Sequence, residues 1–188
     1  MTPEVIPPRV PQFTWVDMGL PSGTLWLDRP LGAASIGDGG LMYQWGALHG
    51  YYTVEQFPFT EEAYRQLGLD SISTDLTVAL DAAAVYYGDD NVRIPTADQM
   101  RELMEHSNIT HSGSVYTLQS QINGNIIKIR AKGLFIDQAV QNPSYAVIWS
   151  RSYVGSFYAM RLQIETSLQY HVEARSRWSG ALILPVKA

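Results

Sequence analysis

Cysteine is absent from the 188-residue chain, and charged residues make up only 16% of it. Without thiols the chain can form no disulfide, no thiolate metal site and no cysteine nucleophile. No hydrophobic run approaches the roughly 18 residues of a membrane-spanning helix, so we expect no membrane insertion. The first eleven residues lack the basic and apolar regions of a signal peptide. The acidic balance, a net charge of −5, argues against nucleic-acid binding.

Glycine, proline and aromatic residues are abundant instead. The chain holds 15 Gly, 10 Pro, 11 Tyr and 5 Trp, a composition typical of loop-rich β proteins. Prolines crowd residues 2–11 and favour extended chain. We therefore expect a proline-rich arm at residues 1–14 and one domain at residues 15–188. A disordered terminus and a tether to a partner subunit or larger particle are equally compatible with the arm.

Charge is distributed unevenly along the chain. Residues 1–110 contain 15 acidic and 5 basic side chains, whereas residues 111–188 contain 3 acidic and 8 basic ones. A basic C-terminal part can face an anionic glycan, or it can complement the acidic part within the fold or a neighbouring subunit. The basic residues are scattered along expected strands, which favours the second explanation.

Turn residues predict two hairpins. Pro21 and Gly23 suit a tight turn over Leu20–Gly23 that joins strands near residues 15–18 and 24–27. Asn123 and Gly124 give the strongest short hairpin signal, between strands at residues 115–121 and 126–131. Alternation in the second of these strands predicts an apolar face and a cationic face.

Helical spacing predicts three short helices, at residues 59–67, 74–87 and 97–106. Thr96 and Gln99 have the spacing of a capping box that opens the third helix. A loop is expected at residues 137–144. Further strands are expected at residues 146–150, 157–165, 169–175 and 181–186.

Five short segments resemble, in order, the conserved blocks of one known family. They are Val16–Trp26 (VDMGLPSGTLW), Tyr43–Gly46, Leu80–Ala84 with Val92–Thr96, Val147–Ser152 and Ala181–Val186. The family is the fibrobacter-type major paralogous domain, a C-type-lectin-like module abundant in gut Bacteroidetes and their phages. It is related to the variable proteins of diversity-generating retroelements and to the formylglycine-generating enzymes. Departures at Ala47, Val92 and Ile183 make the resemblance a better guide to fold than to ligand.

The resemblance implies an α+β, C-type-lectin-like fold with short antiparallel β-sheets, two or three short helices and long loops. Formylglycine-generating relatives hold a metal with cysteines, which this chain lacks, and its four histidines show no metal-binding spacing. We therefore expect no catalytic residues, no metal and no cofactor. Asp89–Asn91 offers oxygen atoms suited to calcium, but a metal-free acidic turn is the favoured interpretation.

In proteins of this kind the C-terminal third contacts the ligand. Tyrosine, tryptophan and arginine concentrate at binding hot spots. Trp26 and Trp149 are expected in the core, as is one of Phe157 and Tyr158 by strand alternation. The candidate ligand-binding residues are Arg151, Tyr153, Tyr158, Arg161, Tyr170, His171, Glu173, Arg175, Arg177 and Trp178.

These observations predict a non-enzymatic surface-recognition module that binds a bacterial surface glycan or protein. The resemblance places it in a phage virion, in a tail or head fibre, or on a cell surface; an exported protein whose leader has been removed is the alternative. We expect a homo-oligomer or a larger virion assembly that forms through the N-terminal arm. The alternative function is a structural or decoration protein of a virion, which uses the same fold for subunit assembly.

Overall fold

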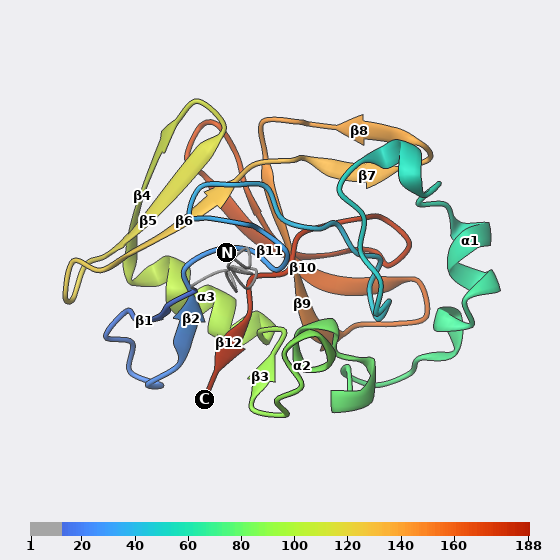
Figure 1. Cartoon of the computed structure of the whole chain (residues 1–188), viewed down its shortest axis with the longest axis horizontal. Helices are drawn as coiled ribbons and strands as arrows, with labels where there is room; N and C mark the ends of the chain where they lie inside the picture. The colour runs from blue at the N-terminus through green and yellow to red at the C-terminus, as the bar shows by residue number, and fades with distance from the viewer. Residues whose placement is uncertain (1–12) are drawn as a thin grey trace, which may run out of the picture.

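Short antiparallel sheets, three α-helices and long connections build residues 13–188, the part of the chain that the structure describes (Figure 1). The structure is a computed structural model. The expected α+β class is confirmed. The arm predicted at residues 1–14 lies outside the described residues, apart from its last two. Within the described part, no helix is long and apolar enough to cross a membrane.

The first and last strands of the described chain lie in one sheet, ordered β1–β2–β12–β3. β1 (Trp15–Asp17) and β2 (Leu25–Leu27) pair antiparallel across the predicted turn. Gly23 closes this turn with a φ of 72°, a left-handed conformation that glycine adopts without strain. β12 (Val186–Lys187) pairs with both β2 and β3 (Val92–Arg93).

The prediction of a strand at residues 181–186 is mostly wrong. Ala181 and Leu182 make only isolated bridges, and regular pairing starts at Val186. Pro185 has no N–H to donate to a ladder. The segment instead runs through the interior, where Ala181, Leu182 and Leu184 are completely buried.

The C-terminal third forms a three-stranded antiparallel sheet ordered β11–β10–β9. β9 spans Ala146–Tyr153, β10 Tyr158–Ile164 and β11 Tyr170–Ser176, which confirms the three strands expected here. Leu162 packs into one hydrophobic cluster and Trp149 into a second cluster on the opposite face. β9 and β10 are therefore buried on both faces along much of their length, whereas β11 has no fully buried residue.

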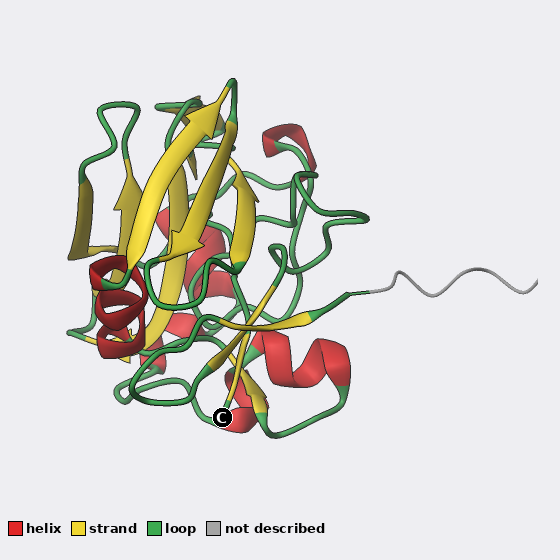
Figure 2. Cartoon of the chain, turned by 90° about the vertical axis from the view of Figure 1, so that its left-hand side faces the viewer, coloured by secondary structure: helices red, strands yellow, loops and turns green. Residues whose placement is uncertain are grey.

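A second three-stranded sheet is ordered β4–β5–β6, on the opposite side of the molecule from α1 (Figure 1), and this side faces the viewer in Figure 2. β5 (Val115–Ser120) and β6 (Ile126–Arg130) confirm the predicted hairpin. Ile127 and Ile129 are fully buried, as the predicted apolar face requires. β4 (Ser107–Ser112) was not predicted, because its sequence is polar and does not alternate.

The β7–β8 hairpin replaces most of the loop predicted at residues 137–144. β7 (Leu134–Ile136) and β8 (Ala139–Gln141) pair antiparallel. Asp137 and Gln138 join them with φ values of 49° and 61°. Left-handed residues at both central positions suit a tight hairpin turn, but glycine or asparagine usually marks such a turn. Their absence explains the wrong prediction.

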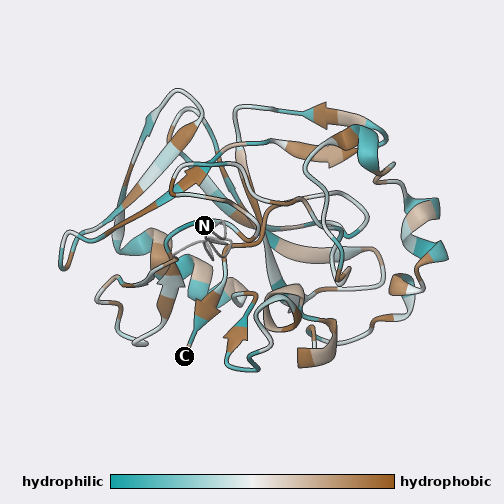
Figure 3. Ribbon diagram, viewed as in Figure 1, coloured by the Kyte–Doolittle hydropathy of each residue, from teal (hydrophilic) through white to brown (hydrophobic). Residues whose placement is uncertain are grey.

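Three α-helices cover the remaining surfaces. They are α1 (Glu61–Gln66), which is mostly hydrophilic (Figure 3), α2 (Ala82–Tyr87) and α3 (Ala97–Glu105). The capping box of α3 is confirmed: Gln99 N–H donates to the Thr96 hydroxyl at 3.1 Å, and Thr96 N–H donates to Gln99 Oε1 at 2.9 Å. Helix boundaries near residues 59–67 and 97–106 were predicted within a few residues.

The helix predicted at residues 74–87 is interrupted at Asp81. This residue takes an extended conformation and caps α2, because its carboxylate accepts hydrogen bonds from the Ala83 and Ala84 amides. A 3₁₀ turn, η3 (Val78–Leu80), precedes it. The other 3₁₀ turns are η1 (Val54–Gln56) and η2 (Leu69–Ser71).

Two of the aromatic predictions for the core are confirmed and one is wrong. Trp26 and Trp149 are each 1% exposed. Phe157 and Tyr158 are both half exposed, although alternation placed one of them in the core. Phe157 precedes the start of β10, so strand alternation does not apply to it.

Candidate functional site

One face of the β10–β11 pair gathers several of the polar residues predicted for recognition. The register pairs Arg161 with Glu173 and Gln163 with His171. Cross-strand partners project to the same face of a sheet, and so does a residue two positions along the strand. Arg175 therefore shares this face. The register thus places Arg161, His171, Glu173 and Arg175 on one face, but Arg161, predicted on an outward surface, is buried.

A cavity of about 330 Å³ lies where the β7–β8 hairpin meets this face. Its volume is near the lower limit of about 300 Å³ for small-molecule sites. Apolar side chains of Leu134, Ile136 and Val147 line part of it. Its polar lining residues are Gln141, Asn142, Arg161, Gln163, Arg175 and Ser176. We refer to it below as the Arg161 cavity.

Arg161 is only 4% exposed, yet its guanidinium is poorly satisfied. Nε and Nη1 are buried and have no hydrogen-bond partner within residues 13–188. Nη2 reaches Gln163 Oε1 at 3.5 Å, beyond the usual length of a hydrogen bond. Burial, together with the charge of Arg175, lowers the pKa of Arg161 to about 10, although Glu173 opposes this shift. A buried cation without compensation is unfavourable for folding.

The carboxylates near this face are occupied by other groups. Glu173 forms an ion pair with Arg175 at 2.5 Å. Glu165 Oε1 accepts a hydrogen bond from Gln163 Nε2 at 3.2 Å and lies 3.4 Å from His171 Nε2. Arg161 is thus left as a charged group without an ion pair among the described residues.

Few other buried side-chain atoms in the described part of the chain lack a partner. They are Trp26 Nε1, Gln44 Oε1 and Ser107 Oγ, all of them neutral. Leaving a charged donor unpaired costs more than leaving a neutral one unpaired. Arg161 is therefore the buried residue whose environment most calls for a functional explanation.

Searches with family models, among curated proteins and among solved structures found no match for this chain. The chemistry of the Arg161 cavity is accordingly argued from its own residues. It offers guanidinium, amide and hydroxyl groups beside an apolar wall, a combination that suits binding of a polar, negatively charged group.

Arg177 lies elsewhere, and its predicted place on an outward surface is wrong. Its side chain is completely buried. Nε donates to the Tyr64 hydroxyl, Nη1 to the carbonyls of Gly155 and Ser156, and Nη2 to those of Leu69 and Ile72, at 2.9 to 3.2 Å. These five acceptors match the five N–H donors of a guanidinium.

Aromatic rings complete the surroundings of Arg177. The Trp45 ring centroid lies 4.5 Å from its Cζ, and the rings of Tyr64 and Tyr153 lie at 5.6 and 5.7 Å. A cation over an aromatic face is stabilised by the ring quadrupole. Arg177 therefore ties together strand, loop and helix segments and has no donor left for a ligand.

The remaining candidates do not share the Arg161 cavity. Tyr158 and Tyr170 lie at opposite ends of the β10–β11 pair, where their register partners are Ser176 and Ile164. Both tyrosines are exposed. The other three, Arg151, Tyr153 and Trp178, are half-buried.

Tyr153 and Arg151 are held by local contacts. Tyr153 packs near Trp45 and Arg177, and its N–H donates to Asp75 Oδ1 at 2.7 Å. Burial and the neighbouring charge of Arg93 lower the pKa of Arg151. The ten candidates therefore divide among several places: four share one face of β10–β11, and two of these, Arg161 and Arg175, line the Arg161 cavity.

Sequence reasoning missed the cavity residues outside β10 and β11. Gln141 ends β8, Asn142 follows it, and Leu134 belongs to β7. A hairpin assignment at residues 134–141 would have brought them next to the predicted residues. The available signal was weak: two short apolar segments separated by Asp137 and Gln138.

A second cavity, of about 310 Å³, is more apolar. Leu67, Leu69, Tyr51, Phe57 and other apolar residues line it. Gln44 also borders it. Its Nε2 donates to the carbonyls of Trp178 and Thr60, whereas its Oε1 has no hydrogen-bond partner among the described residues. Among the described residues, no Lys, Arg, Asp or Glu side chain lines this cavity, and His49 is its one histidine.

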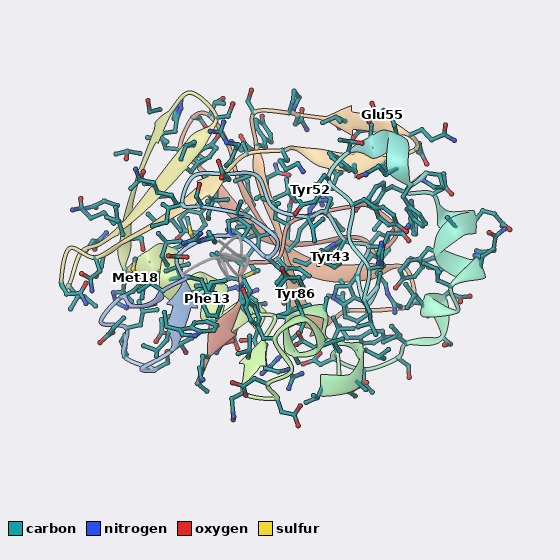
Figure 4. The ribbon with its side chains drawn as sticks, in the orientation of Figure 1. Phe13, Met18, Tyr43, Tyr52, Glu55 and Tyr86 are labelled. Atoms are coloured by element: carbon teal, nitrogen blue, oxygen red, sulfur yellow. The ribbon has the colours of Figure 1, made fainter. Side chains whose placement is uncertain are left out.

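A third cavity, of about 380 Å³, lies under exposed aromatic residues. Phe13, Tyr52 and Tyr86, labelled in Figure 4, line it together with Arg29 and Tyr87. Arg29 already pairs with Asp28. The exposed rings make this region a candidate contact surface.

The acidic turn at Asp89–Asn91 is held by protein groups. Asp89 Oδ2 lies 3.2 Å from Lys187 Nζ, and its other oxygen accepts from the Asn91 amide. Hydrogen bonds from the Asn91 backbone and from Lys187 lower the pKa of Asp89. Within the described residues, no group of three or more His, Asp or Glu side chains has a metal-binding arrangement.

Proposed function

We propose that this chain is a non-enzymatic recognition module with a C-type-lectin-like fold. It binds a bacterial surface glycan or protein through the Arg161 cavity and the adjoining face of β10–β11. In this proposal it acts in a phage virion, in a tail or head fibre, or on a cell surface. The observation that carries the binding role is Arg161, a buried residue that lines the cavity and whose Nε and Nη1 have no hydrogen-bond partner within residues 13–188.

Several features support the proposed fold and the proposed binding role. The ordered resemblance of five segments to C-type-lectin-like proteins agrees with the short antiparallel sheets and three helices observed. Exposed aromatic residues stand beside the sheet that carries the cavity, Tyr158 and Phe157 among them. Tyrosine and phenylalanine give a large contact area at a small entropic cost.

The side chains around the cavity favour binding over catalysis. Arg161 and Arg175 are basic side chains with N–H donors and no lone pair to accept a proton, and the carboxylates of Glu165 and Glu173 already contact other groups. A general base has to reach the proton that it removes with a free lone pair. The cavity instead presents donors that can hold a charged group in place.

Binding to bacterial cells tests this proposal. Fluorescently labelled wild-type protein is incubated with a panel of gut Bacteroidetes cells and with a glycan array. We expect saturable binding, weakened by about tenfold or more in Arg161→Gln, since each charge-assisted contact contributes more than about 1.4 kcal/mol. Arg65→Gln, in the exposed helix α1, is the matched control and should bind as the wild type does. Equal binding by both variants would contradict the proposal.

Subunit assembly is a second candidate function, and the third cavity favours it. Tyr86 is 57% and Tyr52 50% exposed, next to Phe13 at the start of the described chain. Exposed aromatic clusters of this kind often lie at subunit contacts. If assembly is the role, Tyr86→Ser lowers the oligomer mass measured by light scattering. If recognition is the role, the mass stays the same while Arg161→Gln loses its ligand.

A further inference from the structure

We propose that the Arg161 cavity binds the carboxylate of an acidic sugar, a hexuronic acid residue, and that Arg161 is the residue that pairs with this carboxylate. This inference rests on the proposed function, because it names the ligand class of the same site. It also has its own test, which uses small soluble sugars and needs no bacterial surface.

The first step of the argument is the state of the Arg161 donors. Among the residues that the structure describes, Nε and Nη1 have no hydrogen-bond partner, and Nη2 has only the long contact to Gln163 Oε1 at 3.5 Å. Gln163 contacts Nη2, so a ligand that enters the cavity and displaces the Gln163 side chain approaches the guanidinium at an edge that contains Nη2. A carboxylate matches such an edge with two parallel N–H···O bonds.

The second step is charge. Glu173 is paired with Arg175, and Glu165 contacts Gln163 and His171, so no described carboxylate forms an ion pair with Arg161, and Glu173 offsets its charge only in part. The low exposure of Arg161 means that solvent compensates it poorly. An anionic ligand supplies the missing opposite charge. Its attraction to Arg161 therefore offsets part of the desolvation cost of burying this guanidinium.

The third step distinguishes a sugar acid from other anions. Neutral hydrogen-bonding groups of Gln141, Asn142 and Ser176 line the same cavity. They suit the hydroxyl groups of a sugar ring, whereas sulfate or a peptide carboxylate has no hydroxyl groups to offer them. Leu134 and Ile136 supply an apolar wall for the C–H groups of the ring.

Size agrees with this ligand class. The cavity of about 330 Å³ admits one small polar ring and not a longer oligosaccharide. Arg175, whose side chain is 48% exposed, lies at the edge of the cavity with Glu173. The remaining sugars of a glycan would therefore continue outward past this ion pair and the exposed end of β11.

Calorimetric titration of the wild-type protein is the test. The probes are glucuronic acid, glucose, N-acetylglutamate and sodium sulfate. We expect glucuronic acid to bind at least about tenfold more tightly than glucose, since one charged hydrogen-bonded contact contributes about 1.5 to 3 kcal/mol. We expect N-acetylglutamate and sulfate to bind more weakly than glucuronic acid.

Variants locate the binding. Arg161→Gln should lower the affinity for glucuronic acid at least tenfold, and Arg161→Lys should retain part of it, because a lysine keeps the charge without the planar fork. Arg101→Gln on α3 is the matched control and should bind as the wild type does. Wild-type crystals soaked in glucuronic acid should show its carboxylate at Arg161, which requires no variant to fold.

Each contrary result overturns a distinct statement. Glucose binding as tightly as glucuronic acid, or an unchanged affinity in a folded Arg161→Gln variant, rejects the acidic sugar site. Tighter binding of N-acetylglutamate rejects it in favour of an acidic peptide, and tighter binding of sulfate in favour of a simple oxyanion. Glucuronic acid binding without any attachment to cells rejects the proposed function alone. Attachment that glucuronic acid does not inhibit rejects this inference alone.

Discussion

Arg161 lies in β10, Arg177 directly follows the neighbouring strand β11, and both residues are buried. They differ in how completely their guanidinium groups are hydrogen-bonded. Arg177 donates from all three nitrogens to five oxygen acceptors and is covered by aromatic rings. Arg161 borders a cavity, and two of its nitrogens have no hydrogen-bond partner in the described part of the chain. Burial alone therefore says little about the role of a charged residue. The completeness of its hydrogen bonding separates a structural arginine from one that is available to a ligand.

The two sites also differ in how they are built. The acceptors of Arg177 come from α1, η2 and the β9–β10 loop, so this one side chain fixes several segments. The Arg161 cavity is formed by strands and a hairpin that are held by their own ladders. Loss of the first arginine should disturb the fold, whereas loss of the second should disturb binding.

The largest effect is expected for Arg177→Met. The substitution leaves the Tyr64 hydroxyl and four carbonyl groups without their donor, so we expect a loss of about 4 kcal/mol in the free energy of unfolding. Urea unfolding followed by circular dichroism measures it. Arg65→Met, an exposed control, should change stability by less than about 0.5 kcal/mol. A loss below about 1 kcal/mol for Arg177→Met would contradict the structural role.

Asp81, like Arg177, is a buried charged residue whose charged group is hydrogen-bonded by the protein, so it gives a second contrast with Arg161. It accepts from the amides of Ala83, Ala84 and Ile94 and pairs with Arg93 Nε at 2.8 Å. Asp81→Asn should cost about 3 kcal/mol, because the new amide hydrogens face existing donors. Asp98→Asn, in an exposed pair with Arg101, should cost less than about 1 kcal/mol. Similar losses for both variants in urea unfolding would contradict this assignment.

A pH dependence follows from Tyr64 beside Arg177. Burial raises the pKa of Tyr64 to about 12, even though the charge and hydrogen bond of Arg177 lower it. The unfolded value is about 10, so the native state holds this proton more tightly. Its contribution is complete below pH about 10 and is lost as the pH rises through about 12.

Urea midpoints at about pH 9 and about pH 12 measure this effect, which can reach about 2 kcal/mol. The loss of stability between these pH values should be smaller in Tyr64→Phe than in the wild type. Equal losses in the two proteins would show that Tyr64 does not contribute.

The smallest effect on folding is expected for Arg161→Met. An apolar side chain of similar length removes a poorly compensated buried charge, so stability should stay equal or rise by about 1 kcal/mol. Residues kept for binding often cost stability in this way. A loss above about 1 kcal/mol in urea unfolding would instead place Arg161 beside Arg177 as a structural residue.

Much of the fold could be predicted where local chemistry fixes the backbone. Gly23 and the Asn123–Gly124 pair determine turns through their own conformational preferences, and Thr96 with Gln99 determines the start of α3. β4 and β8 could not be predicted this way. Pairing with a neighbouring strand stabilises them: β4 is polar and does not alternate, although Gly113 forms the turn after it, and no glycine marks the turn before β8.

The candidate site could be predicted only in part. The resemblance drew attention to Arg161, His171, Glu173 and Arg175 as residues of the C-terminal third, and the strand register places these four on one face. The resemblance could not separate Arg161 from Arg177, because the acceptors of Arg177 lie as far as 113 residues away in the sequence. The contribution of Gln141 and Asn142 likewise depends on a tertiary contact between a hairpin and a sheet.

Ligand-linked stability measures the role of Arg161 most directly. The melting temperatures of the wild type and of Arg161→Gln are compared with and without saturating glucuronic acid, since a ligand that binds only the native state raises this temperature. We predict a clear rise for the wild type and none for Arg161→Gln. Equal rises in both proteins, or no rise in the wild type, would contradict the assignment of Arg161 as the residue that binds the ligand.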